Sequence, residues 1–264
     1  MAAFDLNPSA ETLENNAQRL RENEYPGRLI AMGRGAGNLI IQAYALMGRS
    51  DSSRDRIFVA GRDGVRTTSP SKSRSEMMSD PSAALIYYRA MARFGGVHVV
   101  SNGAQTSSVL QNIHTSDPLE KATKLTGKLN NIDLSIYEPD NPNFTPRIAG
   151  VIDIRSNAPT PFGLSIVRKD PDSEKAIRSS WEEADFSKLK EGVGYCLHTY
   201  KGDGNPLPSF DSDPYPIPFG ASADSTTRSL WGLLNIDNRV AIVGTEIHIP
   251  GPEYRIIDRH NEQR

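Results

Sequence analysis

Short runs of hydrophobic, β-branched and aromatic residues recur along most of this chain, separated by segments rich in Gly, Pro, Asp and Ser. Runs of this length between turn-forming residues are typical of β-strands. In chain order, the predicted strands are Leu29–Met32, Leu39–Met47, Ile57–Ala60, Ala83–Met91, Val97–Val100, Ile148–Ile154, Phe162–Arg168, Val193–Tyr200, Val240–Ile247 and Tyr254–Ile257. Most of the links between them are short enough for antiparallel hairpins.

The clearest predicted hairpin lies within Asp80–Thr106. Its two apolar runs, Ala83–Met91 and Val97–Val100, flank Phe94-Gly95-Gly96, and such a break predicts a β-hairpin. The second run ends in Ser101-Asn102-Gly103, where glycine permits a sharp turn that exposes backbone N–H groups. Taken alone, the pattern also fits a core hairpin with a surface turn.

Polar side chains of this hairpin are expected to converge near one end of the sheet. Tyr87 and Arg89 share one face of the first strand and Tyr88 takes the other, because strand side chains alternate. A phenol, a guanidinium and the amide of Asn102 are therefore expected close together.

Four segments predict helices instead. Asn7-Pro8 suits the N-cap and first position of a helix, and apolar side chains follow at helical spacing as far as Leu20. Further helices are expected from Ser116-Asp117-Pro118, over Glu174–Leu189 and over Thr226–Leu234. Many strands with few helices predict one α+β domain of layered antiparallel sheets over residues 1–264, with residues 1–24 as an N-terminal helical extension.

The glycine-rich segment Gly33–Asn38 is not expected to bind a dinucleotide. That fingerprint requires a helix after the glycines, whereas the following residues predict the strand Leu39–Met47. A hairpin turn is the better interpretation.

Composition narrows the functional classes. A net charge of -2 gives no general attraction to nucleic acid or to an anionic membrane. No apolar run reaches membrane-spanning length, and the first residues lack the features of a signal peptide. The single cysteine, Cys196, cannot form an internal disulfide. We therefore expect a soluble, cytoplasmic protein that binds neither nucleic acid nor membrane.

Several kinds of site are not expected. No two histidines have the close spacing that a zinc site usually needs, no Gly-x-Ser-x-Gly elbow is present, and the Gly-Asp-Gly turn at Asp203 lacks the repeated ligands of a calcium loop. The histidines are His98, His114, His198, His248 and His260. We predict neither a metal nor a cofactor, which leaves Arg, Tyr, Asn and Glu at strand ends to bind a phosphorylated small molecule and position it for proton transfers.

The segment Gly48–Arg74 is the most cationic part of the chain. Its basic residues are Arg49, Arg54, Arg56, Arg62, Arg66, Lys72 and Arg74. Arginine forks beside Ser and Thr hydroxyls suit phosphate oxygens. A solvated loop and an anion site both fit this pattern.

Six short blocks in the same order resemble the archaeal-type IMP cyclohydrolases and their bacterial relatives. The blocks are Tyr25–Arg34, Ala43-Tyr44 with Arg49-Ser50, Arg66-Thr67-Thr68, Asp80-Pro81, Val99–Gly103, and Tyr137-Glu138 followed by Thr145–Ala149, and together they cover about residues 25–168. The chain departs from the archaeal pattern in its first two dozen residues and in Gln105, where archaeal members tend to have His. The Gly202–Phe210 loop and the chain beyond it look like the bacterial relatives.

The resemblance implies a four-layer αββα sandwich of the N-terminal-nucleophile-hydrolase type, without the N-terminal nucleophile. It also implies that 5-formamidoimidazole-4-carboxamide ribotide closes to IMP with loss of water, without a metal or cofactor. A homo-oligomer is compatible with the exposed sheet edges of such a fold.

The same resemblance implies roles for individual residues. Tyr87 or Tyr88 is the expected proton donor, Asn102 grips the carboxamide or the formyl oxygen, and Glu138 acts as general base or ribose-hydroxyl acceptor. Expected substrate contacts are Arg28, Arg49, Arg66, Thr67, Ser101, Gly103, Thr145 and Arg147. Arg28, Arg49 and Arg66 are candidates for phosphate or ring anchoring.

Two other functions fit the sequence. One is a nucleotide-binding or regulatory protein that keeps the purine pocket without turnover. The other is an amidohydrolase on the sandwich fold, which requires a processed N-terminal Ser, Thr or Cys. The proline-rich segment Pro206–Pro218 fits either a lid or an interface.

Overall fold

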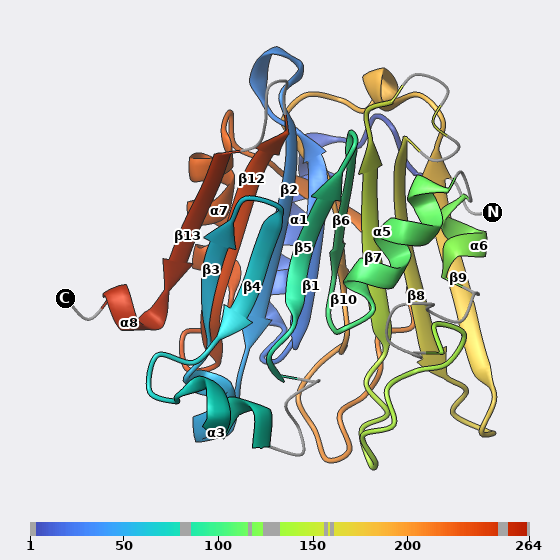
Figure 1. Cartoon of the computed structure of the whole chain (residues 1–264). Coiled ribbons are helices and arrows are strands. Elements are labelled where there is room, and N and C mark those ends of the chain that lie inside the picture. The colour runs from blue at the N-terminus through green and yellow to red at the C-terminus, as the bar shows by residue number, and fades with distance from the viewer. Residues whose placement is uncertain are drawn as a thin grey trace.

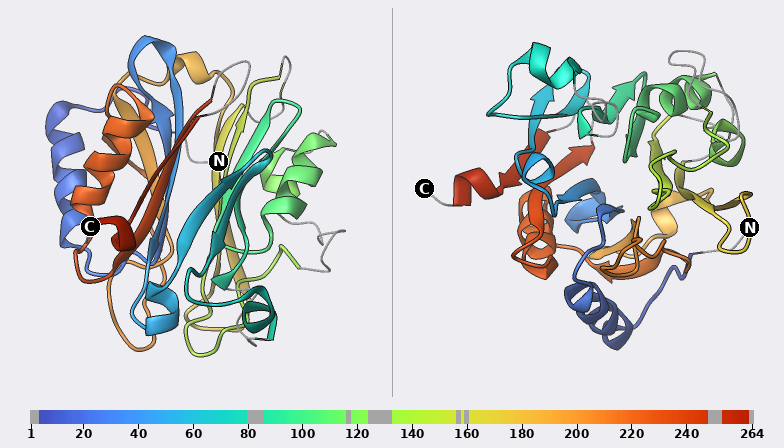
Figure 2. Two further views of the ribbon diagram at one scale, coloured as in Figure 1. Left: turned by 60° about the vertical axis from the view of Figure 1, so that its left-hand side comes forward. Right: turned by 90° about the horizontal axis from the view of Figure 1, so that it is seen from below.

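A computed structural model of the chain describes residues 4–79, 86–115, 118–123, 133–155, 158, 161–247 and 253–262. Two antiparallel sheets pack face to face, and helices cover both outer faces (Figures 1 and 2). This four-layer αββα sandwich confirms the predicted fold class. Within the described ranges, none of the helices has the length and apolar character needed to cross a bilayer.

The first sheet has six strands. They are β1 (Arg28–Arg34), β2 (Ile40–Met47), β10 (Val193–His198), β11 (Tyr215–Pro218), β12 (Arg239–Ile247) and β13 (Glu253–Asp258). Their order across the sheet is β11-β10-β1-β2-β12-β13. Helices α1 (Ala10–Glu22) and α7 (Ala223–Leu233) cover its outer face (Figure 2).

The second sheet has seven strands. They are β3 (Ile57–Gly61), β4 (Gly64–Thr68), β5 (Arg89–Phe94), β6 (Val97–Ser101), β7 (Arg147–Asp153), β8 (Phe162–Lys169) and β9 (Ala176–Glu183), in this order across the sheet. Helices α5 (Thr106–His114) and α6 (Leu119–Ala122) lie on its outer face. The remaining elements are short: η1 (Ala36–Asn38), α2 (Asp51–Arg54), α3 (Arg74–Ser79), η2 (Phe186–Lys188) and α8 (Arg259–Glu262).

The main core fills the space between the sheets. Ile30 and Met32 of β1 face Val100 of β6 and Ile148 of β7, and all four are buried. The two sheets lie close together at Gly150 of β7, where an added Cβ atom would lie 2.7 Å from the Met32 sulfur. A residue without a side chain therefore permits this approach of the two layers.

The glycine-rich hairpin is confirmed. Strands β1 and β2 pair antiparallel on either side of η1, and β2 rather than a long helix follows the glycines. The central hairpin is confirmed over β5 and β6, which turn at Gly95 and Gly96 with positive φ angles of 55° and 86°. Its first strand begins at Arg89, later than predicted, and the predicted start of this segment, within residues 80–85, lies outside the described residues.

Several predicted elements were wrong. Glu174–Leu189 contains strand β9 and the short 3₁₀ helix η2 and not an α-helix, because β9 pairs along β8 and buries Trp181 opposite Leu164. Edge pairing thus outweighs a helix-forming composition. The first helix begins at Ala10 after an N-cap at Ser9, whose hydroxyl accepts from Thr12 N. The predictions also missed β4, β11 and α5.

Candidate functional site

The ends of strands from both sheets meet at one end of the sandwich, the lower end in Figure 1. In the first sheet, Arg28 at the start of β1 pairs with Leu46, near the end of β2. In the second sheet, Ser101 at the end of β6 pairs with Ala149, near the start of β7. Because both sheets are antiparallel, segments distant in the sequence bring their polar ends together here.

A buried chain of polar side chains begins at Glu138. Its carboxylate accepts a hydrogen bond from Arg147 Nη1, which also donates to Gln105 Oε1 at 3.3 Å. Gln105 Nε2 in turn donates to Asn102 Oδ1 at 2.9 Å. The four residues are between 2% and 9% exposed. Buried polar groups connected in this way hold one another in a fixed geometry.

Asn102 is fixed by the protein backbone as well. Its Oδ1 accepts from Ile148 N at 2.8 Å, and its Nδ2 donates to Pro146 O at 2.8 Å. A larger residue at position 103 would displace two side chains of this group, since a Cβ atom at Gly103 would lie 2.9 Å from Glu138 Oε1 and closer still to Gln105 Oε1. Glycine therefore lets the turn after β6 approach the carboxylate closely.

The environment of Glu138 affects its ionisation. Burial raises the pKa of this carboxyl above its ordinary value of 4.5, and the nearby charge of Asp140 adds to the rise. The guanidinium groups of Arg147 and Arg28 oppose it. A carboxylate with a raised pKa in a water-poor site is typical of a general base.

Two hydrogen bonds made by tyrosine hydroxyls lie beside this series of polar side chains. The hydroxyls of Tyr44 on β2 and Tyr88 before β5 are 2.6 Å apart and join the two sheets. Tyr200 donates to Thr145 Oγ1 at 2.5 Å, and Thr145 donates onward to Asp140. Burial raises the pKa of Tyr200 to about 12, so its hydroxyl is protonated at neutral pH.

Arg28 links the tyrosines to the carboxylate. Its guanidinium lies within electrostatic reach of Glu138 and of the tyrosines, which are Tyr25, Tyr44, Tyr88 and Tyr200. Arg28 therefore lies among polar residues that come from several of the six sequence blocks. Sequence reasoning missed Tyr200, and it quoted Tyr44 within a block without giving it a role.

Arg56 is a second functional candidate, which the sequence marked only as one of the basic residues of Gly48–Arg74. It is 2% exposed, and its guanidinium donates to Ser53 O and Met47 O, each at 2.8 Å. Burial lowers its pKa, and the charge of Arg28 lowers it further. No carboxylate in the described ranges forms an ion pair with Arg56. Two neighbouring cations in a buried setting favour an anionic ligand between or beside them.

Arg49 lies at the rim of the same end. Its Nη1 is 2.5 Å from Asp203 Oδ1 and 2.9 Å from Gly204 O, and its guanidinium covers the ring of Tyr25 at 5.0 Å. The loop between β10 and β11, which holds Asp203, also contacts the turn before β7, because Leu207 N donates to Asn143 Oδ1 at 3.0 Å. The loop therefore links the segment after β2 to the segment before β7.

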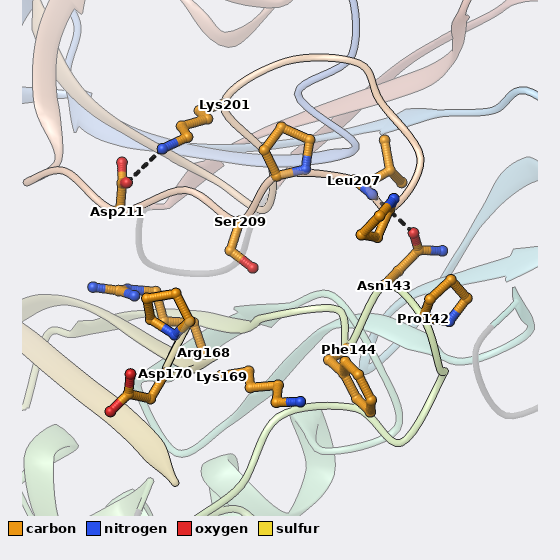
Figure 3. Close-up of a pocket in the computed structure, with 13 residues that line it drawn as sticks. Pro142, Asn143, Phe144, Arg168, Lys169, Asp170, Lys201, Leu207, Ser209 and Asp211 are labelled. Carbon is orange, nitrogen blue, oxygen red and sulfur yellow. Dashed lines mark hydrogen bonds and ion pairs between the residues drawn. The ribbon is translucent and has the colours of Figure 1, made fainter. Parts of the chain in front are cut away.

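A cleft of about 440 Å³ opens beneath this loop (Figure 3). Lys201 and Asp211 form an ion pair of 2.6 Å on one wall, and Arg168 and Lys169 project from the other. Lys169 Nζ lies 4.0 Å from the centre of the Phe144 ring. The cleft adjoins the buried cluster, because Thr145 directly follows Phe144 and Tyr200 directly precedes Lys201.

The other predicted residues have different environments. Thr67 holds the segment before β5, since its Oγ1 donates to Ile86 O at 2.7 Å and accepts from Tyr88 N at 2.9 Å. Ser101 Oγ is 2.5 Å from Thr106 Oγ1. The hydroxyl of Tyr87 is buried and has no hydrogen-bond partner among the described residues. Arg66 is exposed, and its strand neighbour Val65 faces the main core, so Arg66 lies on the opposite face of β4, away from the cluster.

Metal ligands do not gather in the part of the chain that the structure describes. No group of three or more His, Cys, Asp or Glu side chains there is arranged to hold an ion. His248 lies outside the described residues.

Comparison with known proteins adds an independent result. Residues 25–249 match the family described as IMP cyclohydrolase-like protein. No curated protein matches the chain. The matched range includes both sheets apart from the last strand, and every residue of the polar cluster. The chain therefore belongs to the IMP cyclohydrolase-like protein family.

Proposed function

We propose that this chain closes 5-formamidoimidazole-4-carboxamide ribotide to IMP with loss of water. The observation that carries the proposal is the convergence of a buried carboxylate–guanidinium pair, a chain of amides and a pair of tyrosine hydroxyls at one end of the sandwich. Membership of the family supports this chemistry. The proposed steps need only proton transfer and charge stabilisation, without a metal or cofactor.

The reaction joins the carboxamide nitrogen to the formyl carbon of the same molecule. The protein must therefore hold the two groups in contact, rather than bring two molecules together. As the C–N bond forms, the carboxamide nitrogen loses a proton and the formyl oxygen gains one. The C–O bond then breaks, the hydroxyl leaves as water after taking a second proton, and the former formamide nitrogen loses its proton to complete the C=N bond.

In this proposal Glu138 accepts the proton from the carboxamide nitrogen. Its raised pKa brings its basicity closer to neutral pH, where a carboxylate is a more effective base. Arg147 orients the carboxylate through its direct hydrogen bond. Asn102 donates its remaining amide hydrogen to the formyl oxygen, together with neighbouring backbone groups around Gly103, as charge develops there.

Tyr88 is the proposed proton donor to the formyl oxygen and then to the leaving hydroxyl. Its hydroxyl is paired with that of Tyr44, so the two oxygens can share a proton, and the protons released by the two nitrogens restore the donor. Arg28 and Arg56 are proposed to anchor the substrate phosphate or ring, and Arg49 to contact it at the rim. Arg66 is omitted because its side chain is on the outer face. A homo-oligomer and a cytoplasmic location stay predictions.

The proposal is tested by incubating the purified protein with the formylated ribotide and following the absorbance of IMP. Glu138→Gln and Asn102→Ala should each lower kcat/KM by about 10²- to 10⁴-fold, the usual contribution of one general base or one stabilising donor. Arg66→Ala is the matched control, since it removes a cation on the outer face, and it should keep wild-type activity.

A protein that binds IMP but never closes the ring would contradict the proposal. It would favour the non-catalytic nucleotide-binding function instead. Retained activity in both Glu138→Gln and Asn102→Ala would contradict the assigned roles even if the wild-type protein turned over substrate.

A further inference from the structure

A second cavity lies at the opposite end of the seven-stranded sheet. The turn between β3 and β4 and the turn between β5 and β6 enclose a volume of about 320 Å³. Arg62, Asp63, Arg93 and His98 provide its polar side chains. We name it the turn-end cavity. Its volume falls within the range of small-molecule sites, and it shares no residue with the polar cluster around Glu138.

His98 is the most unusual residue of the turn-end cavity. Its side chain is on the core face of β6 and only 7% exposed, yet its ring forms no hydrogen bond with any described residue. Burial, and then the charge of Arg93, lowers its pKa to about 4, against the opposing effect of Asp153. The neutral ring offers one N–H donor and one acceptor. Because His98 lines the cavity and its ring nitrogens are not among the fully buried unpartnered atoms, the ring can contact a ligand in the cavity.

The two arginines give the cavity an uncompensated positive charge. Arg93 Nε and Nη2 donate to Arg62 O at 3.2 and 2.8 Å, and Arg93 also contacts the Tyr254 hydroxyl. In the described ranges, neither guanidinium forms an ion pair with a carboxylate.

Two carboxylates near the cavity are paired with other arginines. Asp63 Oδ2 lies 2.7 Å from Arg89 Nη2, and Asp153 Oδ2 lies 2.6 Å from Arg155 Nη2. These carboxylates therefore do not neutralise the two arginines of the cavity. Two guanidinium groups and an imidazole N–H together present several donors and a charge suited to a dianion.

We propose that the turn-end cavity binds a phosphate monoester of a small molecule, separately from the proposed catalytic site. A phosphate group has enough oxygens to accept from both arginines and from His98 at once. The cavity is larger than a phosphate ion, so the organic part of the ester would also lie against it. The proposal does not depend on the cyclohydrolase function.

Calorimetric titration of the full chain with ribose 5-phosphate, at pH 7 and fixed salt, tests this site. Arg93→Gln should weaken binding to the turn-end cavity by at least about tenfold, the effect of removing one charge-assisted contact. Arg62→Gln should weaken it as well, and this exposed side chain can be replaced without disturbing the fold. In NMR spectra, the ring signals of His98 should shift on titration.

The proposal is overturned if neither substitution changes the titration, or if the His98 signals do not move at millimolar ribose 5-phosphate. Titration with inorganic phosphate shows whether the site recognises a phosphate monoester or any phosphate anion. The inorganic ion should bind at least about tenfold more weakly than the ester, and equal affinity would contradict recognition of a monoester. Ribose without phosphate should give no His98 shift, and a shift would refute anion recognition.

Discussion

Glu138 receives opposing influences from its neighbours, and these make its ionisation a sensitive probe of the site. Burial and Asp140 raise its pKa, while Arg147 and Arg28 lower it. The direction of the shift is upward from 4.5. If Glu138 is the base, the active form is the carboxylate, so activity is lost as pH falls through the raised pKa.

We therefore expect the acid limb of the pH profile of kcat/KM to lie above 4.5. Asp140→Asn removes a neighbouring negative charge, so it should move this limb to lower pH. The measurement is IMP formation across the acid range, with Asp237→Asn, a change at an exposed carboxylate elsewhere, as control. A limb at or below 4.5 that does not respond to Asp140→Asn would exclude Glu138 as the titrating base.

The two adjacent tyrosines should differ in their contribution. The Tyr88 hydroxyl belongs to the cluster, whereas the Tyr87 hydroxyl contacts no described polar group. Tyr88→Phe should lower kcat by about 10²-fold or more because a proton donor is lost, and Tyr87→Phe should have a smaller effect. Both variants keep the aromatic ring, and circular dichroism checks their folding. A larger loss in Tyr87→Phe would transfer the donor role to that residue.

Several residues of the candidate site were predictable because they lie within the sequence blocks that resemble the family. Asn102, Glu138 and Arg147 were selected this way, and they form one hydrogen-bonded chain with Gln105. Arg66 was also selected from a block, but neither the block nor its charge shows which face of the strand it occupies. Recognition of β4 would have placed it correctly, since its two neighbours in the strand face inward and the residue between them must face outward.

At the scale of elements, the close contact between β1 and β7 depends on a missing side chain. A Cβ atom at Gly150 would lie 2.7 Å from Met32 Sδ and 3.0 Å from Val100 Cγ1. Gly150→Ala should therefore destabilise the protein by about 1–3 kcal/mol, the usual cost of overpacking a core. Urea unfolding provides the measurement.

Gly202→Ala is the matched control, because a Cβ atom at Gly202 has no neighbour within 4 Å. It should change the free energy of unfolding by less than about 0.5 kcal/mol. Equal stability of the two variants would show that the sheets separate or shift at no cost where β1 and β7 meet.

Elements with a strong apolar pattern were predictable, and those defined by their neighbours were not. Strands β1, β2, β7, β8 and β12 were all found close to their predicted ranges. Strand β9 was missed although it follows β8 in a hairpin, because its residues are mostly charged or hydroxyl-bearing and only Trp181 is buried, so the apolar pattern of a strand is weak. Strand β11 was hidden in a proline-rich segment, since Pro216 and Pro218 are unusual in a strand and fit only because β11 is an edge.

At the scale of the whole molecule, the sandwich explains how distant segments form one site. Strand ends from both sheets meet at the same end, and the loop between β10 and β11 joins the segments next to them through Arg49 and Asn143. The fold class was predictable from the number and type of strands together with the resemblance. The pairing of Tyr44 with Tyr88 across the layers was not, because it depends on how the two sheets are aligned.

The central claim is that the chain forms a covalent bond within its ligand and does more than hold it. The most direct measurement uses substrate labelled with ¹³C at the formyl carbon and follows this carbon by NMR with catalytic amounts of protein. We predict that the formyl signal disappears and that the C2 signal of IMP grows in its place over many turnovers. A formyl signal that shifts or broadens on binding but persists would contradict the account.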